Sequence, residues 1–187
     1  MKHLVIALAF AVALTGCSLP AQLKSSPSVR YYVLTSPLPP SSASEAAGIG
    51  VLPVTLPGYL TRQQIVVRDG DGVNLSIHEY DRWAESLSQG ISRVLCDTLA
   101  VRGIPALPLR TGAKVTDKLM LDVRRLDGPL GGNAVLDVVW RLQRDGNVLR
   151  SGHLVKSRPA GETIESMVEA QSLLVQDLAE SIATNLH

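Results

Sequence analysis

Hydrophobic and polar residues alternate with a period of two over several short stretches of the chain, and this is the spacing of β-strands. Two of the intervening turns have the composition of hairpin turns: residues 69–72 (Asp-Gly-Asp-Gly) and residues 145–146 (Asp-Gly). After the first turn, Val73, Leu75 and Ile77 share one face, and the opposite face is expected to meet solvent. The predicted strands span residues 29–34, 49–54, 65–68, 73–78, 120–126, 134–143 and 148–155.

Two longer segments change to a period of three to four, which indicates amphipathic helices. The first helix is predicted over residues 82–102, with Asp81 as its N-cap and Gly103 as its C-terminal stop. The second is predicted from about residue 162 to the end of the chain. Their apolar faces consist of Leu87, Ile91, Val94, Leu95 and Leu99 in the first helix, and Ile164, Met167, Val168, Leu174, Val175, Leu178 and Ile182 in the second.

This order of elements predicts an α/β (α+β) fold. Specifically, we expect a two-layer sandwich in which two amphipathic helices cover one face of a mostly antiparallel sheet. Residues 35–48, rich in proline, serine and alanine, are expected to form an irregular loop. No Phe follows residue 16, so the core should be aliphatic, with Trp83 and Trp140 as its largest side chains.

The first 16 residues form a separate apolar segment. Lys2 and His3 precede an uninterrupted apolar run over residues 4–14. As a helix this run would be ~16 Å long, about half of the ~30 Å that a bilayer core requires. The pattern predicts a cleaved signal peptide over residues 1–16, followed by a tether over residues 17–28 and one domain over residues 29–187.

The residues Leu14, Thr15, Gly16 and Cys17 resemble a bacterial lipobox. The resemblance implies that Cys17 carries a covalent diacylglycerol and an N-acyl chain, which would fix the protein to a membrane. The alternative is an ordinary signal peptide followed by an incidental cysteine. Ser18 stands where an Asp would imply retention at the inner membrane, so the resemblance favours the periplasmic face of the outer membrane.

The charge balance excludes a polybasic nucleic-acid-binding segment. Lys and Arg number 18 against 17 Asp and Glu, for a formal net charge of +1. Residues 1–16 hold one Lys and no acid, so 17 basic residues balance 17 acidic ones in the remainder. With 45% hydrophobic residues the chain is not disordered, and its length suits one domain. We expect no nucleic-acid partner.

No catalytic or metal-binding motif is present in the sequence. It lacks Gly-x-Ser-x-Gly, Cys-x-x-Cys and His-Glu-x-x-His, and His78, His153 and His187 are scattered. Residues 69–72 lack the further ligands of a calcium loop. Cys96 falls within the apolar register of the first helix, so we interpret it as a core residue. The sequence therefore predicts no enzyme activity, no metal and no cofactor.

Residues 51–68 hold more proline, tyrosine and arginine than a plain strand needs. Leu56, Pro57, Gly58, Tyr59 and Leu60 are followed by Arg62, Gln64 and Arg68. The stretch resembles the ABC-type transport auxiliary lipoproteins, the family of paraquat-inducible lipoprotein C (PqiC-like). Residues 31–34, 83–85 and the terminal helix add to the resemblance, whereas Thr61 and Gln63 depart from the family pattern.

The resemblance implies a non-enzymatic auxiliary component of an intermembrane lipid transport system. The implied partner is an MCE-domain protein of an ABC-type or PqiB-like system, with a homo-oligomeric ring as a further possibility. Tyr59, Leu60, Arg62 and Gln64 are the candidate partner-binding residues. The alternative is that Tyr59 and Leu60 fill the core while Arg62 pairs with an acid. The rival functions are a periplasmic lipid-binding carrier or chaperone and, as a third hypothesis, a hydrolase.

Overall fold

The computed structural model describes residues 27–36, 48–109 and 115–186. The predicted signal peptide, Cys17 and the tether up to residue 26 lie outside the described residues. Most of the loop predicted over residues 35–48 also lies outside them. Pro27 is the first described residue of the folded domain.

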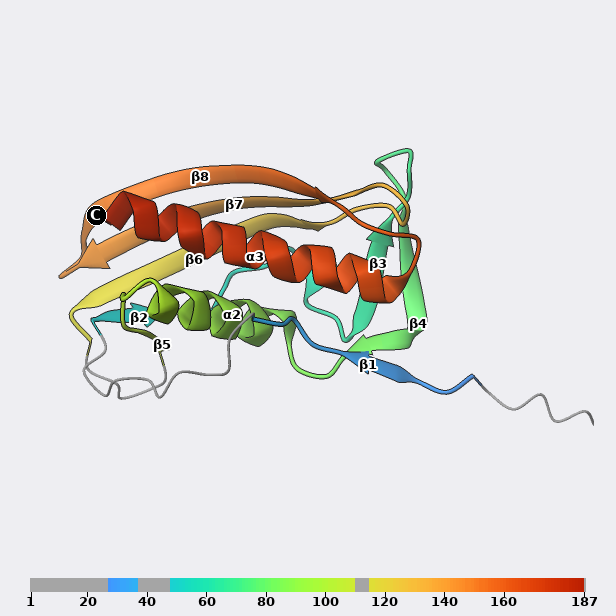
Figure 1. Cartoon of the computed structure of the whole chain (residues 1–187), viewed down its shortest axis with the longest axis horizontal. Coiled ribbons are helices and arrows are strands. Elements are labelled where there is room, and N and C mark those ends of the chain that lie inside the picture. The colour runs from blue at the N-terminus through green and yellow to red at the C-terminus, as the bar shows by residue number, and fades with distance from the viewer. Residues whose placement is uncertain (1–26, 37–47, 110–114, 187) are drawn as a thin grey trace, which may run out of the picture.

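The domain contains a five-stranded sheet, two helices on one of its faces, and a three-stranded sheet at one end (Figure 1). The large sheet has the order β5-β2-β6-β7-β8 and the small one the order β1-β4-β3. The elements are β1 (Arg30–Tyr32), β2 (Ile49–Val51), the 3-10 helix η1 (Gly58–Leu60), β3 (Gln64–Arg68), β4 (Leu75–Trp83), α2 (Leu87–Val101), β5 (Ala106–Pro108), β6 (Asp117–Asp127), β7 (Asn133–Arg144), β8 (Asn147–Pro159) and α3 (Ile164–Leu186).

The three long strands of the large sheet pair antiparallel, as the alternating pattern predicts. β6 pairs with β7 and β7 with β8, whereas the short β2 and β5 add parallel pairings at one edge. Asp145 and Gly146, with φ angles of 49° and 82°, form the turn between β7 and β8. The α+β class and the two helices on one face of the large sheet are confirmed (Figure 1). The sequence does not predict β5, because three residues are too few to show a hydrophobic periodicity.

The first helix begins later than predicted. β4 continues to Trp83, and α2 starts at Leu87 with Ser86 as its N-cap, where the Ser86 hydroxyl accepts a hydrogen bond from the Gln89 N–H. Asp81 is therefore a strand residue, not the N-cap. The physical reason is a long-range pairing, since β1 lies parallel to the last three residues of β4 and holds them extended. No helix within the described ranges is both long and apolar enough to cross a bilayer.

The core is continuous between the large sheet and the two helices, and it extends to the small sheet. The predicted apolar faces of both helices are buried. Cys96 is buried in the same core, and burial raises the pKa of its thiol to about 12. Leu75 and Ile77, in contrast, are exposed on β4, so the face predicted to pack inward meets solvent instead.

Trp140 is the largest of the most deeply buried side chains, with 2% of its surface exposed. It packs against a glycine of the neighbouring strand. It lies opposite Gly152 of β8, and a Cβ on that glycine would lie 2.7 Å from the indole Nε1. Gly152 therefore provides the space that the indole occupies.

We expect Gly152→Ala to lower the free energy of unfolding by about 1–3 kcal/mol, because the added methyl group overpacks the indole. Gly70→Ala is the matched control: it lies in the β3–β4 turn with no heavy atom within 4 Å, and its effect should stay within about 0.5 kcal/mol. Urea unfolding of both variants measures the difference. Equal stability of the two variants would contradict the packing argument.

Candidate functional site

The stretch that carries the family resemblance forms a short turn before β3. Pro57 has an extended backbone, and the 3-10 helix η1 follows it directly. The Leu60 N–H donates to the Pro57 carbonyl at 2.9 Å, and the Thr61 hydroxyl donates to the Gly58 carbonyl at 2.8 Å. Local hydrogen bonds therefore define this turn, and we call residues 57–64 the docking turn, after the role that the family resemblance implies for them.

A buried carboxylate joins the docking turn to both sheets. Asp127, at the end of β6, is fully buried. It accepts a hydrogen bond from the Tyr59 hydroxyl at 2.5 Å and two from the Arg68 guanidinium of β3, at 2.8 and 3.0 Å. Arg125 donates to it at 2.9 Å. The Arg68 guanidinium also lies 5.7 Å from the centre of the Tyr59 ring, a cation–π distance.

These contacts change the acid–base behaviour of the cluster. Burial disfavours the charged form of Asp127, but hydrogen bonds from Arg68, Tyr59 and Arg125 outweigh it and hold the pKa of this carboxyl below its ordinary value. Burial and the hydrogen bond to Asp127 raise the pKa of Tyr59 to about 12. Asp127 is therefore ionised and Tyr59 protonated at neutral pH, which is the arrangement of a structural clamp.

The four candidate partner-binding residues divide into two pairs. Leu60 is buried in the core, and Tyr59 is half-buried through its contact with Asp127, as the core-filling alternative expects. Arg62 is exposed and forms no hydrogen bond or ion pair with the residues described, so the acid partner of that alternative is not found. Gln64 is partly exposed and donates to Glu79 at 3.3 Å. The docking turn therefore presents Arg62 and Gln64.

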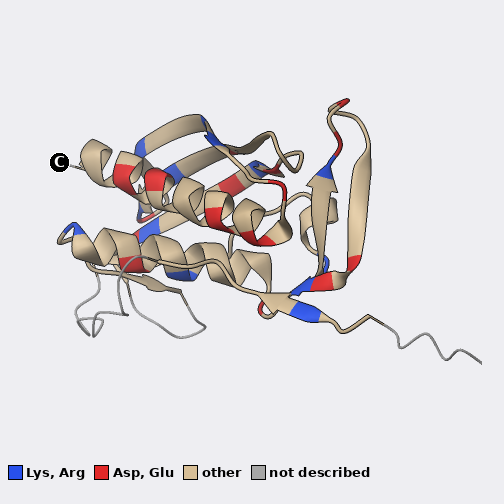
Figure 2. Ribbon diagram, turned by 45° about the vertical axis from the view of Figure 1, so that its right-hand side comes forward, with Lys and Arg blue, Asp and Glu red and all other residues tan. Residues whose placement is uncertain are grey.

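A second polar cluster, which the sequence reasoning missed, fastens the N-terminal strand. Arg30 of β1 donates to Asp81 at 2.8 Å and to Glu165 of α3 at 3.0 Å. The Tyr32 hydroxyl lies 3.0 Å from Asp81 and 2.8 Å from Glu165. Burial, and then these two carboxylates, raise the pKa of Tyr32 above its ordinary value. Figure 2 shows the basic segment of β1 beside the charged end of β4.

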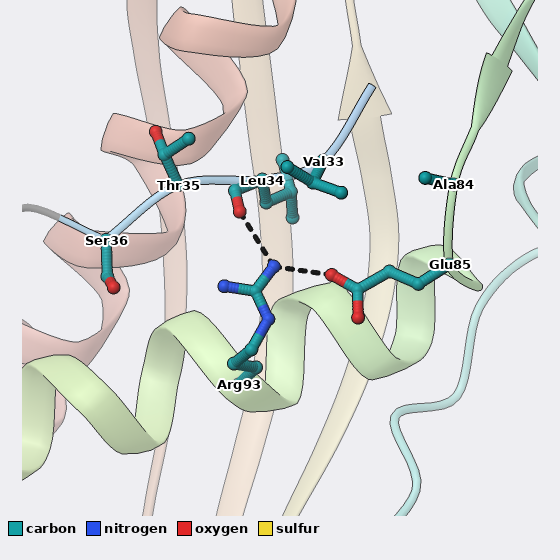
Figure 3. Close-up of a pocket in the computed structure, with 7 residues that line it drawn as sticks. All are labelled: Val33, Leu34, Thr35, Ser36, Ala84, Glu85 and Arg93. Carbon is teal, nitrogen blue, oxygen red and sulfur yellow. Dashed lines mark hydrogen bonds and ion pairs between the residues drawn. The ribbon is translucent and has the colours of Figure 1, made fainter. Parts of the chain in front are cut away.

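A hollow of about 460 Å³ lies between residues 33–36 and the start of α2 (Figure 3). Arg93 reaches across it from α2, donating to the Leu34 carbonyl at 2.8 Å and pairing with the Glu85 carboxylate. The hydrogen bond thus ties the chain after β1 to α2, and the ion pair ties α2 to the residues that follow β4. Within the described ranges, no group of three or more His, Cys, Asp or Glu side chains could hold a metal ion.

One protein family matches this chain, over residues 32–183, and its description is ABC-type transport auxiliary lipoprotein component. No curated protein matches the chain. The match covers the Asp127 cluster, the docking turn and the second cluster except for Arg30, and it ends just before the last described residues of α3.

Solved structures share the fold at low sequence identity. An uncharacterized protein reaches a TM-score of 0.73 at 20% identity, over 86% of this chain and 100% of its own. A protein from Xanthomonas campestris reaches 0.67 at 18% identity, over 84% of this chain and 95% of its own. A PelC dodecamer from Paraburkholderia phytofirmans has a TM-score of 0.48 at 12% identity, over 81% and 93%. That score is too low to transfer an assembly.

We expect Asp127→Asn to lower the free energy of unfolding by about 3 kcal/mol at pH 7, because it leaves Arg68 and Arg125 without their buried counter-charge. The folded-state pKa of Asp127 is depressed, so its contribution is present above the unfolded pKa of about 3.9 and is lost as pH falls through the lower folded value. Urea unfolding from pH 7 to pH 2 should therefore show the two proteins converging in acid.

Glu180→Gln is the control for this loss of charge. It removes the ion pair with Arg102, in which both side chains are about half exposed, and should cost less than about 1 kcal/mol. A loss as small for Asp127→Asn, or one that does not shrink in acid, would show that Asp127 does not clamp the docking turn.

Proposed function

The chain belongs to the ABC-type transport auxiliary lipoprotein family, and from this we propose that it is a non-enzymatic adaptor that docks a transport assembly at a membrane. The observation that carries the proposal is the extent of the match, since residues 32–183 include nearly the whole folded domain. The family is a family of lipoproteins, which agrees with the lipobox at residues 14–17.

The proposed anchor is Cys17, carrying a diacylglycerol and an N-acyl chain at the periplasmic face of the outer membrane. One acyl chain binds a membrane only marginally, whereas three chains hold the protein there stably. Anchoring confines the search for a partner to the membrane surface and raises the effective concentration of the docking turn. A weak protein interface is then sufficient for docking.

The proposed partner is an MCE-domain protein that carries lipid between the two membranes. The docking turn supports this role because Arg62 and Gln64 are presented by a backbone that Asp127 clamps to both sheets. A contact surface that is rigid before binding loses little conformational entropy on docking. An exposed Arg suits an interface because its guanidinium forms several hydrogen bonds at once. A homo-oligomeric ring would match the symmetry of MCE rings.

Replacement of the proposed anchor residue tests lipidation directly. We expect Cys17→Ala to abolish labelling by radioactive palmitate in cells and to release the protein from the membrane fraction. Cys96→Ala is the matched control, because Cys96 is buried and should leave labelling unchanged. Palmitate labelling that survives Cys17→Ala would contradict the proposed anchor.

Photocrosslinking in cells tests the docking turn. A photoreactive amino acid in place of Arg62 should capture the MCE-domain protein, because the side chain projects from the clamped turn. The control position is Val101 at the end of α2, which is 51% exposed and should capture none of it. Capture of unrelated envelope proteins alone, or equal capture from both positions, would contradict the proposed contact.

A further inference from the structure

Exposed apolar side chains gather on the small sheet. Thirteen large apolar side chains of the described residues are exposed, and seven of them belong to β1, β4 or the residues beside these strands. Tyr31 is 60% exposed, Tyr80 46% and Ile77 43%. The seven are Val29, Tyr31, Val33, Val73, Leu75, Ile77 and Tyr80.

The strand register places several of these side chains on one face. Residues opposite each other in neighbouring strands point to the same side of a sheet. Tyr31 lies opposite Arg82, and Arg82 lies opposite Gln64 of β3. The register shifts between Gln64 and Ile65 because β4 holds extra residues there, whereas β3 continues without any. Val66, two residues after Gln64 on β3, therefore lies on the same side as Gln64, and it stands opposite Ile77. We call this side of the small sheet the outer face.

The other side of the small sheet packs on the core. Tyr32 and Trp83 lie opposite each other, Trp83 belongs to the core and Tyr32 packs against it. The Asp81 and Glu165 contacts hold β1 to this arrangement. The outer face is therefore fixed in direction relative to the whole domain.

The outer face lies where the chain enters the domain. Nine residues lie between Cys17 and Pro27, the first described residue, and the ten Cα–Cα steps from Cys17 to Pro27 span at most about 35 Å when fully extended. In Figure 1, the described chain enters the domain at β1, on the side opposite the C-terminal ends of α2 and α3. Acyl chains on Cys17 would thus keep the outer face close to a bilayer.

The chemistry of the outer face matches a bilayer surface. Tyrosine is enriched at membrane interfaces, where its ring meets the acyl boundary and its hydroxyl meets water and headgroups. Ile77 and Leu75 add apolar area. Arg82 lies between Tyr31 and Gln64 across the three strands, and a guanidinium attracts lipid phosphate. Exposed apolar patches on a folded domain mark such contact sites.

We propose that the outer face of the small sheet rests on the phospholipid headgroup layer and sets the orientation of the domain on the membrane. The contact rests on the proposed lipidation of Cys17, which brings the face to the bilayer. Gln64 stands in the same row as Tyr31, so the docking turn adjoins this contact. A partner bound at Arg62 would then sit directly at the membrane surface.

Site-specific fluorescence quenching tests the orientation. Tyr31→Cys, Ile77→Cys and the control Val101→Cys are each labelled with a fluorophore in the full-length, lipidated protein. Acylation blocks Cys17 and burial protects Cys96, so the label reaches the new thiol. The proteins are reconstituted into vesicles of phosphatidylethanolamine and phosphatidylglycerol that contain a spin-labelled lipid quencher.

The inference expects the lipid quencher to reduce fluorescence at positions 31 and 77 by at least about twofold, and to leave position 101 nearly unchanged. Labels at 31 and 77 that stay unquenched in vesicle-bound protein overturn the contact but leave the Cys17 anchor standing. Labels shielded from aqueous iodide yet unquenched by lipid also overturn it, because a second copy or a protein partner then covers the face. A protein that does not float with the vesicles overturns the anchor and the contact together.

Discussion

The arrangement of the small and large sheets depends on the ion pair between the buried carboxylate of Asp127 and Arg68. Asp127 is the last residue of β6 in the large sheet, and Arg68 belongs to β3 in the small sheet. Tyr59 of the docking turn donates a hydrogen bond to the same carboxylate. A buried charge is tolerated only when its partners satisfy it, so these groups must stay together in the folded state. One carboxylate thus fixes the relative position of three segments.

The second cluster, formed by Arg30, Tyr32, Asp81 and Glu165, holds β1, the edge strand of the small sheet opposite β3. Arg30 and Tyr32 hold β1 against Asp81 of β4 and Glu165 of α3. A three-residue edge strand has few ladder hydrogen bonds of its own, and these side-chain contacts compensate for its shortness. Because the described chain enters the domain at β1, the same contacts connect its N-terminal end to α3 and not to the small sheet alone.

Sequence patterns predicted the elements that pack on the core, because burial imposes the period of two or of three to four on them. β6, β7, β8 and both helices were found for this reason. The patterns failed where a distant segment decides the structure. The start of the first helix was predicted at residue 82, yet β1 pairs with residues 81–83 and keeps them extended. The outward direction of Ile77 was missed because alternation alone does not tell which face is covered.

For the candidate site, the residues alone indicate the family resemblance, the resemblance of residues 14–17 to a lipobox, and the residue types of the docking turn. The positions of these residues in the turn depend on long-range contacts: Leu60 is in the core, Tyr59 belongs to the Asp127 clamp, and Arg62 is exposed. Asp127 lies 68 residues after Tyr59, and no local pattern signals such a contact. Hydrophobic periodicity is a local property of the chain, whereas a buried ion pair forms only when separate strands are brought together.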